Sequence, residues 1–132
     1  MSKYKVTQTV LREAKPLVAA LQAVGYTKDQ IEVHDEPQPL YGYRGDKRAE
    51  KAHVIIRRQH VGSASNDVGF VLGEKAKAII SDFDSHTHFT NKKLKAVVQH
   101  YSKAIILEES KSSLFEFEMD GDDMIVKVPV NA

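Results

Sequence analysis

The sequence predicts an α+β fold, a two-layer sandwich in which a mainly antiparallel sheet carries two amphipathic helices on one face. Several short runs have apolar residues at every second position, which is typical of strands. Two longer runs have apolar residues at helical spacing. Most of the strand-like runs are close together in sequence, which favours antiparallel pairing, with the helices covering one face of the sheet.

The first predicted strand covers residues 4–10. Tyr4, Val6 and Val10 share one parity there, so we expect them to face the core.

The first predicted helix covers residues 14–24. Pro16 suits its first turn, where a missing N–H costs nothing, and Gly25 is a typical helix stop. A short strand at residues 31–34 follows.

A loop is predicted at residues 36–46, because two prolines and two glycines disfavour a continuous strand. Residues 52–58 predict a central strand with apolar residues on both faces. After a turn at residues 62–67, residues 68–72 and 77–83 predict a hairpin.

Thr90 is the predicted N-cap of the second helix, with Phe89 and Leu94 placed to form a hydrophobic staple. Residues 115–119 and 126–130 alternate apolar with polar residues and predict a terminal hairpin.

Composition limits the classes of protein to consider. A chain of 132 residues, 42% of them hydrophobic, has the size and core of one domain, so we expect a single domain over residues 1–132. The absence of cysteine excludes disulfides, thiolate zinc sites and cysteine nucleophiles. No apolar run reaches the length of a signal peptide or a membrane span, so we expect no membrane association and a cytoplasmic location.

Charge is unevenly distributed, although the formal net charge is only +1. Residues 40–60 hold six bases and two acids, a net charge of +4. Residues 108–123 hold seven acids and one base, a net charge of −6. The first segment is a candidate surface for an anionic partner, and the second repels one.

The segment Tyr41-Gly-Tyr-Arg-Gly45 is the first candidate site. Tyr41 and Tyr43 could stack on a ligand while Arg44, Arg48 and Arg57 supply positive charge. The alternative is that the tyrosines fix the loop to the edge of the sheet and the arginines are solvated.

Asn66 and Asp67 are a second candidate, for a cation or a polar ligand. We favour the alternative, an Asx-type turn in which the side chain bonds its own backbone at the start of a strand.

Asp82, Asp84, His86 and His88 form the metal candidate. In an extended chain they share one face, and carboxylate with imidazole suits zinc, iron or manganese. Four ligands along one strand lie too far apart for one ion, so at most two neighbours could serve. We favour a polar loop leading into the second helix, and we expect no cofactor.

Four segments together resemble a known family: 38–46, 52–58, 65–70 and 94–102. The chain resembles the uncharacterised cyanobacterial and algal-plastid proteins of domain of unknown function 1257. The resemblance covers nearly the whole chain, apart from a departure around residues 82–89. It implies a small cytosolic or plastid-stroma protein without an established enzymatic role. Some members are encoded beside ring-forming ATPases, which implies an accessory role.

These observations predict a non-enzymatic binding or adaptor protein with an unidentified protein partner. No serine elbow, phosphate-binding loop or dinucleotide motif indicates an enzyme. The expected contact surface covers residues 41–58, with Phe70 nearby. Two alternatives stay open: a small domain that binds single-stranded RNA, and a metal-dependent enzyme or sensor that uses His86 and His88.

Overall fold

The fold is known from a computed structural model, which describes residues 3–112, 116–120 and 123–127, and the side chains of residues 3–109. The elements, in chain order, are β1 (Tyr4–Gln8), α1 (Ala14–Ala23), η1 (Lys28–Gln30), β2 (Glu32–Tyr41), β3 (Lys47–Ile56), α2 (Arg58–Val61), β4 (Val68–Val71), β5 (Lys77–Ser81), α3 (Asp82–His86), α4 (Asn91–Ser112), β6 (Glu116–Asp120) and β7 (Asp123–Lys127).

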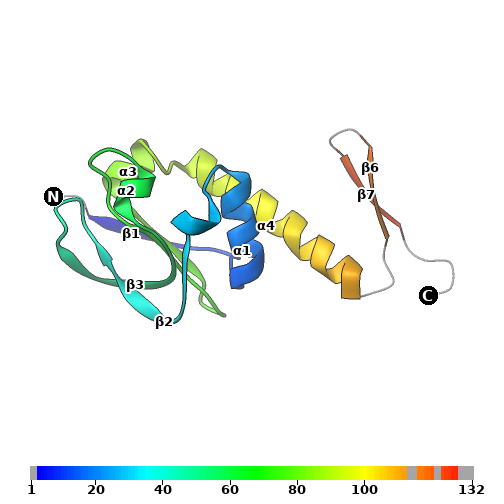
Figure 1. The fold of residues 1–132 in the computed structure, drawn as a ribbon, viewed down its shortest axis with the longest axis horizontal. Coiled ribbons are helices and arrows are strands. Elements are labelled where there is room, and N and C mark those ends of the chain that lie inside the picture. The colour runs from blue at the N-terminus through cyan, green and yellow to red at the C-terminus, as the bar shows by residue number, and fades with distance from the viewer. Residues whose placement is uncertain (1–2, 113–115, 121–122, 128–132) are drawn as a thin grey trace.

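Five strands form one sheet in the order β1-β5-β4-β3-β2, and every neighbouring pair is antiparallel. The two long helices, α1 and α4, lie together on one face of this sheet (Figure 1). The predicted α+β class is therefore confirmed, with β3 between two other strands and the β4–β5 hairpin paired as expected.

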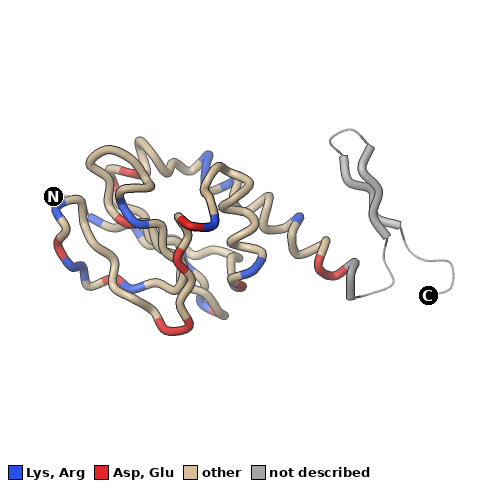
Figure 2. Tube along the Cα trace, in the orientation of Figure 1, with Lys and Arg blue, Asp and Glu red and all other residues tan. Residues whose placement is uncertain are grey.

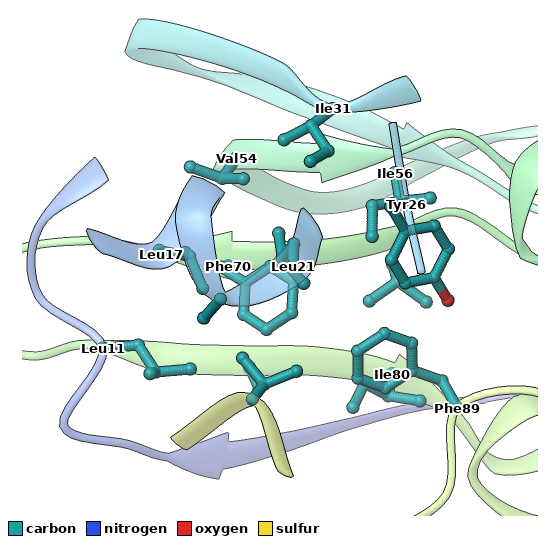
Figure 3. Close-up of a cluster of buried hydrophobic side chains, with 14 of the residues drawn as sticks. Leu11, Leu17, Leu21, Tyr26, Ile31, Val54, Ile56, Phe70, Ile80 and Phe89 are labelled. Atoms are coloured by element: carbon teal, nitrogen blue, oxygen red, sulfur yellow. The ribbon is translucent and has the colours of Figure 1, made fainter. Parts of the chain in front are cut away.

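The main core fills the space between the sheet and the two helices (Figure 3). Leu17 and Leu21 of α1 and Val97 of α4 are fully buried against Phe70 of β4. The ring of Phe89, just before α4, packs edge-on against the ring of Phe70, with centroids 6.0 Å apart. Such aromatic pairs add stability beyond the area they bury.

Helix α1 has its expected limits, and a distant side chain caps its start. The side chain of Glu13, the N-cap residue, makes no capping hydrogen bond. Instead the Tyr101 hydroxyl of α4 accepts the backbone N–H groups of Arg12 (3.0 Å) and Glu13 (3.1 Å). Gly25 follows the helix with φ +117°, which only glycine adopts readily.

The second long helix also begins as predicted. The Thr90 hydroxyl accepts the N–H of Lys93 at 3.4 Å, and Phe89 is fully buried in front of α4. The apolar stripe of α4 joins the core through the expected residues Leu94, Val97, Val98, Tyr101 and Ile105.

Two expectations about strands were wrong. The predicted loop at residues 36–46 is largely strand, because β2 runs through Pro37 and Pro39 to Tyr41. Strand β2 lies at an edge of the sheet and shifts register twice against β3, and edge strands and bulges are the places where proline is tolerated.

The first strand is also oriented differently from the prediction. Val6 and Val10 are 54% and 55% exposed, so they do not face the helix-covered core. Lys5 and Thr7, at the alternate positions, lie on the face toward the helices. Their partners in β5 are Ile80 and Ala78, which belong to the main core, and paired residues share a face of the sheet.

The second face of the sheet is covered in part by the β2–β3 hairpin itself. Leu40, Ala52, Ile55 and Ile79 form a second buried cluster there, with Tyr4 and Val71 packed against it. Gly69 of β4 permits this close approach, because a Cβ atom at Gly69 would lie 2.6 Å from that of Ala52. The tip of the hairpin thereby reaches the start of β1 (Figure 1), where the Tyr4 hydroxyl lies 3.4 Å from the carbonyl oxygen of Tyr41.

The terminal hairpin is confirmed at the level of the backbone. Strands β6 and β7 pair antiparallel with Phe117 opposite Val126. Residues 115 and 128–130 of the predicted hairpin lie outside the described residues.

Candidate functional site

The candidate site is built on the tip of the β2–β3 hairpin, residues 41–47. The N–H of Gly42 donates to the carbonyl of Asp46 at 2.8 Å, and the N–H of Gly45 donates to that of Gly42 at 2.8 Å. Gly45 has φ +78°, a conformation that favours glycine. The turn presents Tyr43 and Arg44 at its end, with the Arg44 guanidinium 5.3 Å from the centre of the Tyr43 ring.

Asp67, at the start of β4, connects the hairpin tip to the rest of the fold. Its side chain is 1% exposed. Its Oδ2 atom accepts the N–H of Tyr41 and a guanidinium N–H of Arg57, both at 2.8 Å, and its Oδ1 atom accepts the N–H of Arg58 at 2.7 Å. The Tyr4 hydroxyl donates to its backbone carbonyl at 2.8 Å.

Asn66, next to Asp67 in the sequence, makes a similar set of contacts. The fully buried side chain accepts the N–H of Tyr43 at 2.9 Å and donates to the Ser81 hydroxyl at 2.9 Å. Its backbone N–H donates to the Asp84 carboxylate at 2.9 Å. The expected Asx turn is therefore wrong: these side chains bond segments far away in the sequence rather than their own backbone.

Arg57 is held by internal contacts. It makes a bidentate pair with Glu32, at 2.8 and 2.9 Å, and also donates to Asp67 and to the carbonyl of Pro39. These carboxylates raise the pKa of Arg57, and the Arg57 hydrogen bond lowers the pKa of Glu32. Arg57, directly after β3, therefore connects β2 to Asp67 through charge-assisted hydrogen bonds.

The other predicted aromatic and basic residues differ in how far they face solvent. Arg44 is exposed and Tyr43 is half-buried. Tyr41 is 36% exposed, with Arg57 5.8 Å from its ring centre. Arg48 instead turns inward, 4.9 Å from the centre of the Tyr4 ring.

A shallow pocket of about 420 Å³ lies beside the tip, lined by residues of β2, the hairpin turn, the start of α2 and the start of β4. Tyr41, Gly45, Arg58 and Gln59 are among the residues that line it. Arg58 donates to the carbonyl of Tyr43 at 3.0 Å. The structure therefore gathers Tyr41, Tyr43, Arg44, Arg57, Asn66 and Asp67 around the tip, although Phe70 lies in the core on the helix side.

Burial also determines the protonation state of Tyr4, whose side chain lies against the hairpin tip. Burial raises the pKa of its phenol well above its ordinary value, and nearby Asp67 raises it further. Tyr4 therefore stays neutral and donates its hydroxyl hydrogen to the carbonyl of Asp67.

The metal candidate does not have the extended geometry that the prediction assumed. Residues 82–86 form helix α3, whose N-cap hydroxyl at Ser81 accepts the N–H of Asp84 at 3.1 Å. Asp84 points into the protein and is fully buried, whereas His86 is exposed. Within the described ranges, no three His, Asp or Glu side chains are grouped so that they could hold a metal ion.

Ser65, His88 and Asp84 lie close together but are not arranged as a catalytic triad. The Ser65 hydroxyl and the Asp84 carboxylate both contact the same nitrogen of His88, Nδ1, at 2.9 and 3.4 Å. A triad needs the hydroxyl and the carboxylate on different ring nitrogens. Ser65 is also 2% exposed, so no substrate reaches it.

Five residues of this network were missed in the sequence: Tyr4, Glu32, Arg58, Ser65 and Ser81. Ser81 had a recognisable signal, since Ser-x-x-Asp at residues 81–84 is a helix-capping pattern. Ser65 and Arg58 had none, because their partners are distant in sequence.

Comparison with known proteins identifies one family. The family described as "Protein of unknown function (DUF1257)" has a model that matches residues 20–123, from within α1 to the start of β7. No curated protein and no solved structure matches the chain. In the described part of the chain, no helix is both long and apolar enough to cross a membrane.

Proposed function

The chain belongs to the DUF1257 family, as its resemblance indicated, and we propose that it is a non-enzymatic binding or adaptor module that holds a protein partner on the tip of the β2–β3 hairpin. One observation carries the proposal. The buried side chains of Asn66 and Asp67 accept the backbone N–H groups of Tyr41, Tyr43 and Arg58, so the tip is fixed before any partner arrives.

Such prior fixing favours binding, because a preorganised surface loses less conformational entropy when it meets a partner. Tyr43 and Arg44 are also suited to contact a protein, since tyrosine and arginine are enriched among the residues that dominate interface energies. Their stacked arrangement offers an aromatic face and a guanidinium group at one place. We expect the partner to present a carboxylate beside an apolar side chain.

Single-stranded RNA fits this surface less well. Basic and acidic residues are interspersed along the hairpin rather than forming one basic stripe (Figure 2). Arg57 is bound by two carboxylates, and Arg48 packs on Tyr4 beside Asp46. The cations that the hairpin turns outward are Arg44, Lys47 and Lys51.

The experiment is affinity capture from the source cells with three tagged forms of the chain. These are the wild type, the double variant Tyr43→Ala/Arg44→Ala, and the control Arg12→Ala, which removes another exposed arginine, away from the tip. We expect the wild type and the control to retain the same protein, and the double variant to lose it.

Two results would overturn the proposal. Identical captured proteins from all three forms would place binding elsewhere. Retention of nuclease-sensitive RNA, weakening steeply as salt is raised, would favour the RNA alternative instead.

A further inference from the structure

The two edges of the sheet differ in how well they are protected against pairing with another strand. Strand β2 carries Pro37 and Pro39 and shifts register twice, features that typically protect an edge. Strand β1 has no proline and keeps one unbroken register against β5, from Tyr4 to Gln8. Of these two edges, β1 is the one that can accept a further strand.

The backbone of β1 points the required groups outward. The carbonyl of Lys3 accepts the N–H of Asp82, and the N–H of Thr9 donates to the carbonyl of Ala76. These bonds show that the odd-numbered residues of this segment direct their backbone N–H and C=O groups toward β5. Because polar groups alternate along an antiparallel strand, Tyr4, Val6 and Gln8 direct their N–H and C=O groups toward the free edge.

An apolar groove lies at the C-terminal end of this edge. Its volume is about 510 Å³, and it lies between the end of β1 and the first half of α4. Val10, Leu94 and Val98 contribute apolar surface, and Lys95 is the charged residue in the lining. An edge strand beside a groove is the arrangement by which folded domains bind extended segments, with backbone bonds along the edge and alternate side chains in the groove.

The chain itself contains a segment with the complementary pattern. Residues 115–120, Phe-Glu-Phe-Glu-Met-Asp, alternate apolar residues with acids, and they belong to the segment of net charge −6. Among the described residues, β6 pairs with β7 and with no other strand. A two-stranded sheet alone is marginally stable in water, so this hairpin has apolar surface to bury.

We propose that the β1 edge and its groove bind strand β6 of a second copy of this chain, so that two copies exchange their terminal hairpins in a closed dimer. The apolar residues of the segment would enter the groove, while its acids lie near Lys95. A second copy fits better than the same chain, because α4 continues from Gln99 to Ser112, about 20 Å beyond the groove. Reciprocal exchange fills the groove of each copy with the hairpin of the other, so no groove is left to bind a third copy.

The test is the molar mass in solution, measured by sedimentation equilibrium over a range of protein concentrations. We expect a monomer of 14.8 kDa in equilibrium with a dimer of twice that mass. Val10→Asp places a charge in the groove and should raise the dimer dissociation constant about tenfold or more. The matched control is Val33→Asp on the protected edge, where the side chain is 50% exposed; it should leave the constant unchanged.

Two further variants identify the occupant. Lys95→Glu reverses the charge of the groove at an exposed helical position, so it should weaken the dimer and leave the circular dichroism spectrum unchanged. Glu116→Gln/Glu118→Gln/Asp120→Asn neutralises the segment and should weaken the dimer as well. A monomer at every concentration, or equal effects of Val10→Asp and Val33→Asp, would overturn the proposal. A dimer that responds to Val10→Asp but not to the neutralised segment would also overturn it, since β1 would then pair with β1.

Discussion

Replacing Asp67 by asparagine removes one charge from the centre of the site and changes almost no volume. Asp67 uses both carboxylate oxygens as acceptors, for the N–H groups of Tyr41 and Arg58 and for Arg57. Asparagine has one acceptor oxygen and an NH₂ group. In either orientation of the amide, that NH₂ group faces a backbone N–H, so at least one buried donor loses its partner.

The magnitude follows from these contacts. An unsatisfied buried donor costs about 1–3 kcal/mol. Breaking a buried ion pair costs about 3–5 kcal/mol, but Arg57 keeps Glu32 and is partly exposed, which lowers that contribution. We therefore expect Asp67→Asn to lower the free energy of unfolding by about 3–5 kcal/mol, a large part of the about 5–15 kcal/mol typical of a domain.

The assay is urea unfolding followed by circular dichroism. The midpoint should fall by at least about 1 M for Asp67→Asn. Asp35→Asn, at an exposed position of β2, is the control and should change stability by less than about 0.5 kcal/mol. If Asp67→Asn lies within about 1 kcal/mol of the wild type, Asp67 does not hold the hairpin tip as we argue.

Three other perturbations test separate parts of the fold. Tyr101→Phe removes the acceptor for two N–H groups at the start of α1 and should cost about 1–3 kcal/mol in urea unfolding; no loss would mean that water caps the helix equally well. Glu32→Gln tests a pH effect. Because the pKa of Glu32 is lowered in the fold, its pair with Arg57 stabilises the protein above about pH 4.3 and this stability is lost as the pH falls below that value. The variant should therefore show less acid destabilisation than the wild type in thermal melts between pH 7 and pH 3, and an unchanged pH dependence would contradict the assignment. Gly69→Ala forces a Cβ atom within 2.6 Å of Ala52 and should cost about 1–3 kcal/mol, partly recovered by adding Ala52→Gly; equal stability of the single variant and the wild type would show that the hairpin can move away.

The sequence predicted the elements that depend on local periodicity. Helices α1 and α4 and the β4–β5 hairpin have their expected positions, because each contains enough apolar residues at one spacing to define its buried face. Helix α1 also ends at a glycine whose conformation terminates it.

The errors arose where position in the sheet, rather than local pattern, determines the structure. Pro37 and Pro39 are compatible with strand only because β2 is at an edge. Val6 is exposed because its face of β1 is the one that the helices leave uncovered, and Val10 lies beyond the end of β1, in the open groove beside α4. Neither fact can be read from the residues of those strands alone.

The candidate site was predicted in part. The sequence singled out the Tyr41–Gly45 segment with Arg57 as one candidate and Asn66 with Asp67 as another, and the structure brings the two together, which the sequence had not predicted. The roles of the last three were not predictable, because the groups that their side chains bind lie between 9 and 26 residues away in the sequence. The metal hypothesis required an extended segment at residues 82–88, and the Ser81 cap turns most of it into a helix.

Amide hydrogen exchange, resolved by residue with NMR, tests the central claim most directly: that Asn66 and Asp67 fix the hairpin tip in the free protein. We expect the amides of Tyr41, Tyr43 and Arg58 to exchange as slowly as those of the core strand β4. If the three amides instead exchange as fast as those of the exposed turn residues Glu74 and Lys75, the tip is not held and the proposed docking surface loses its physical basis.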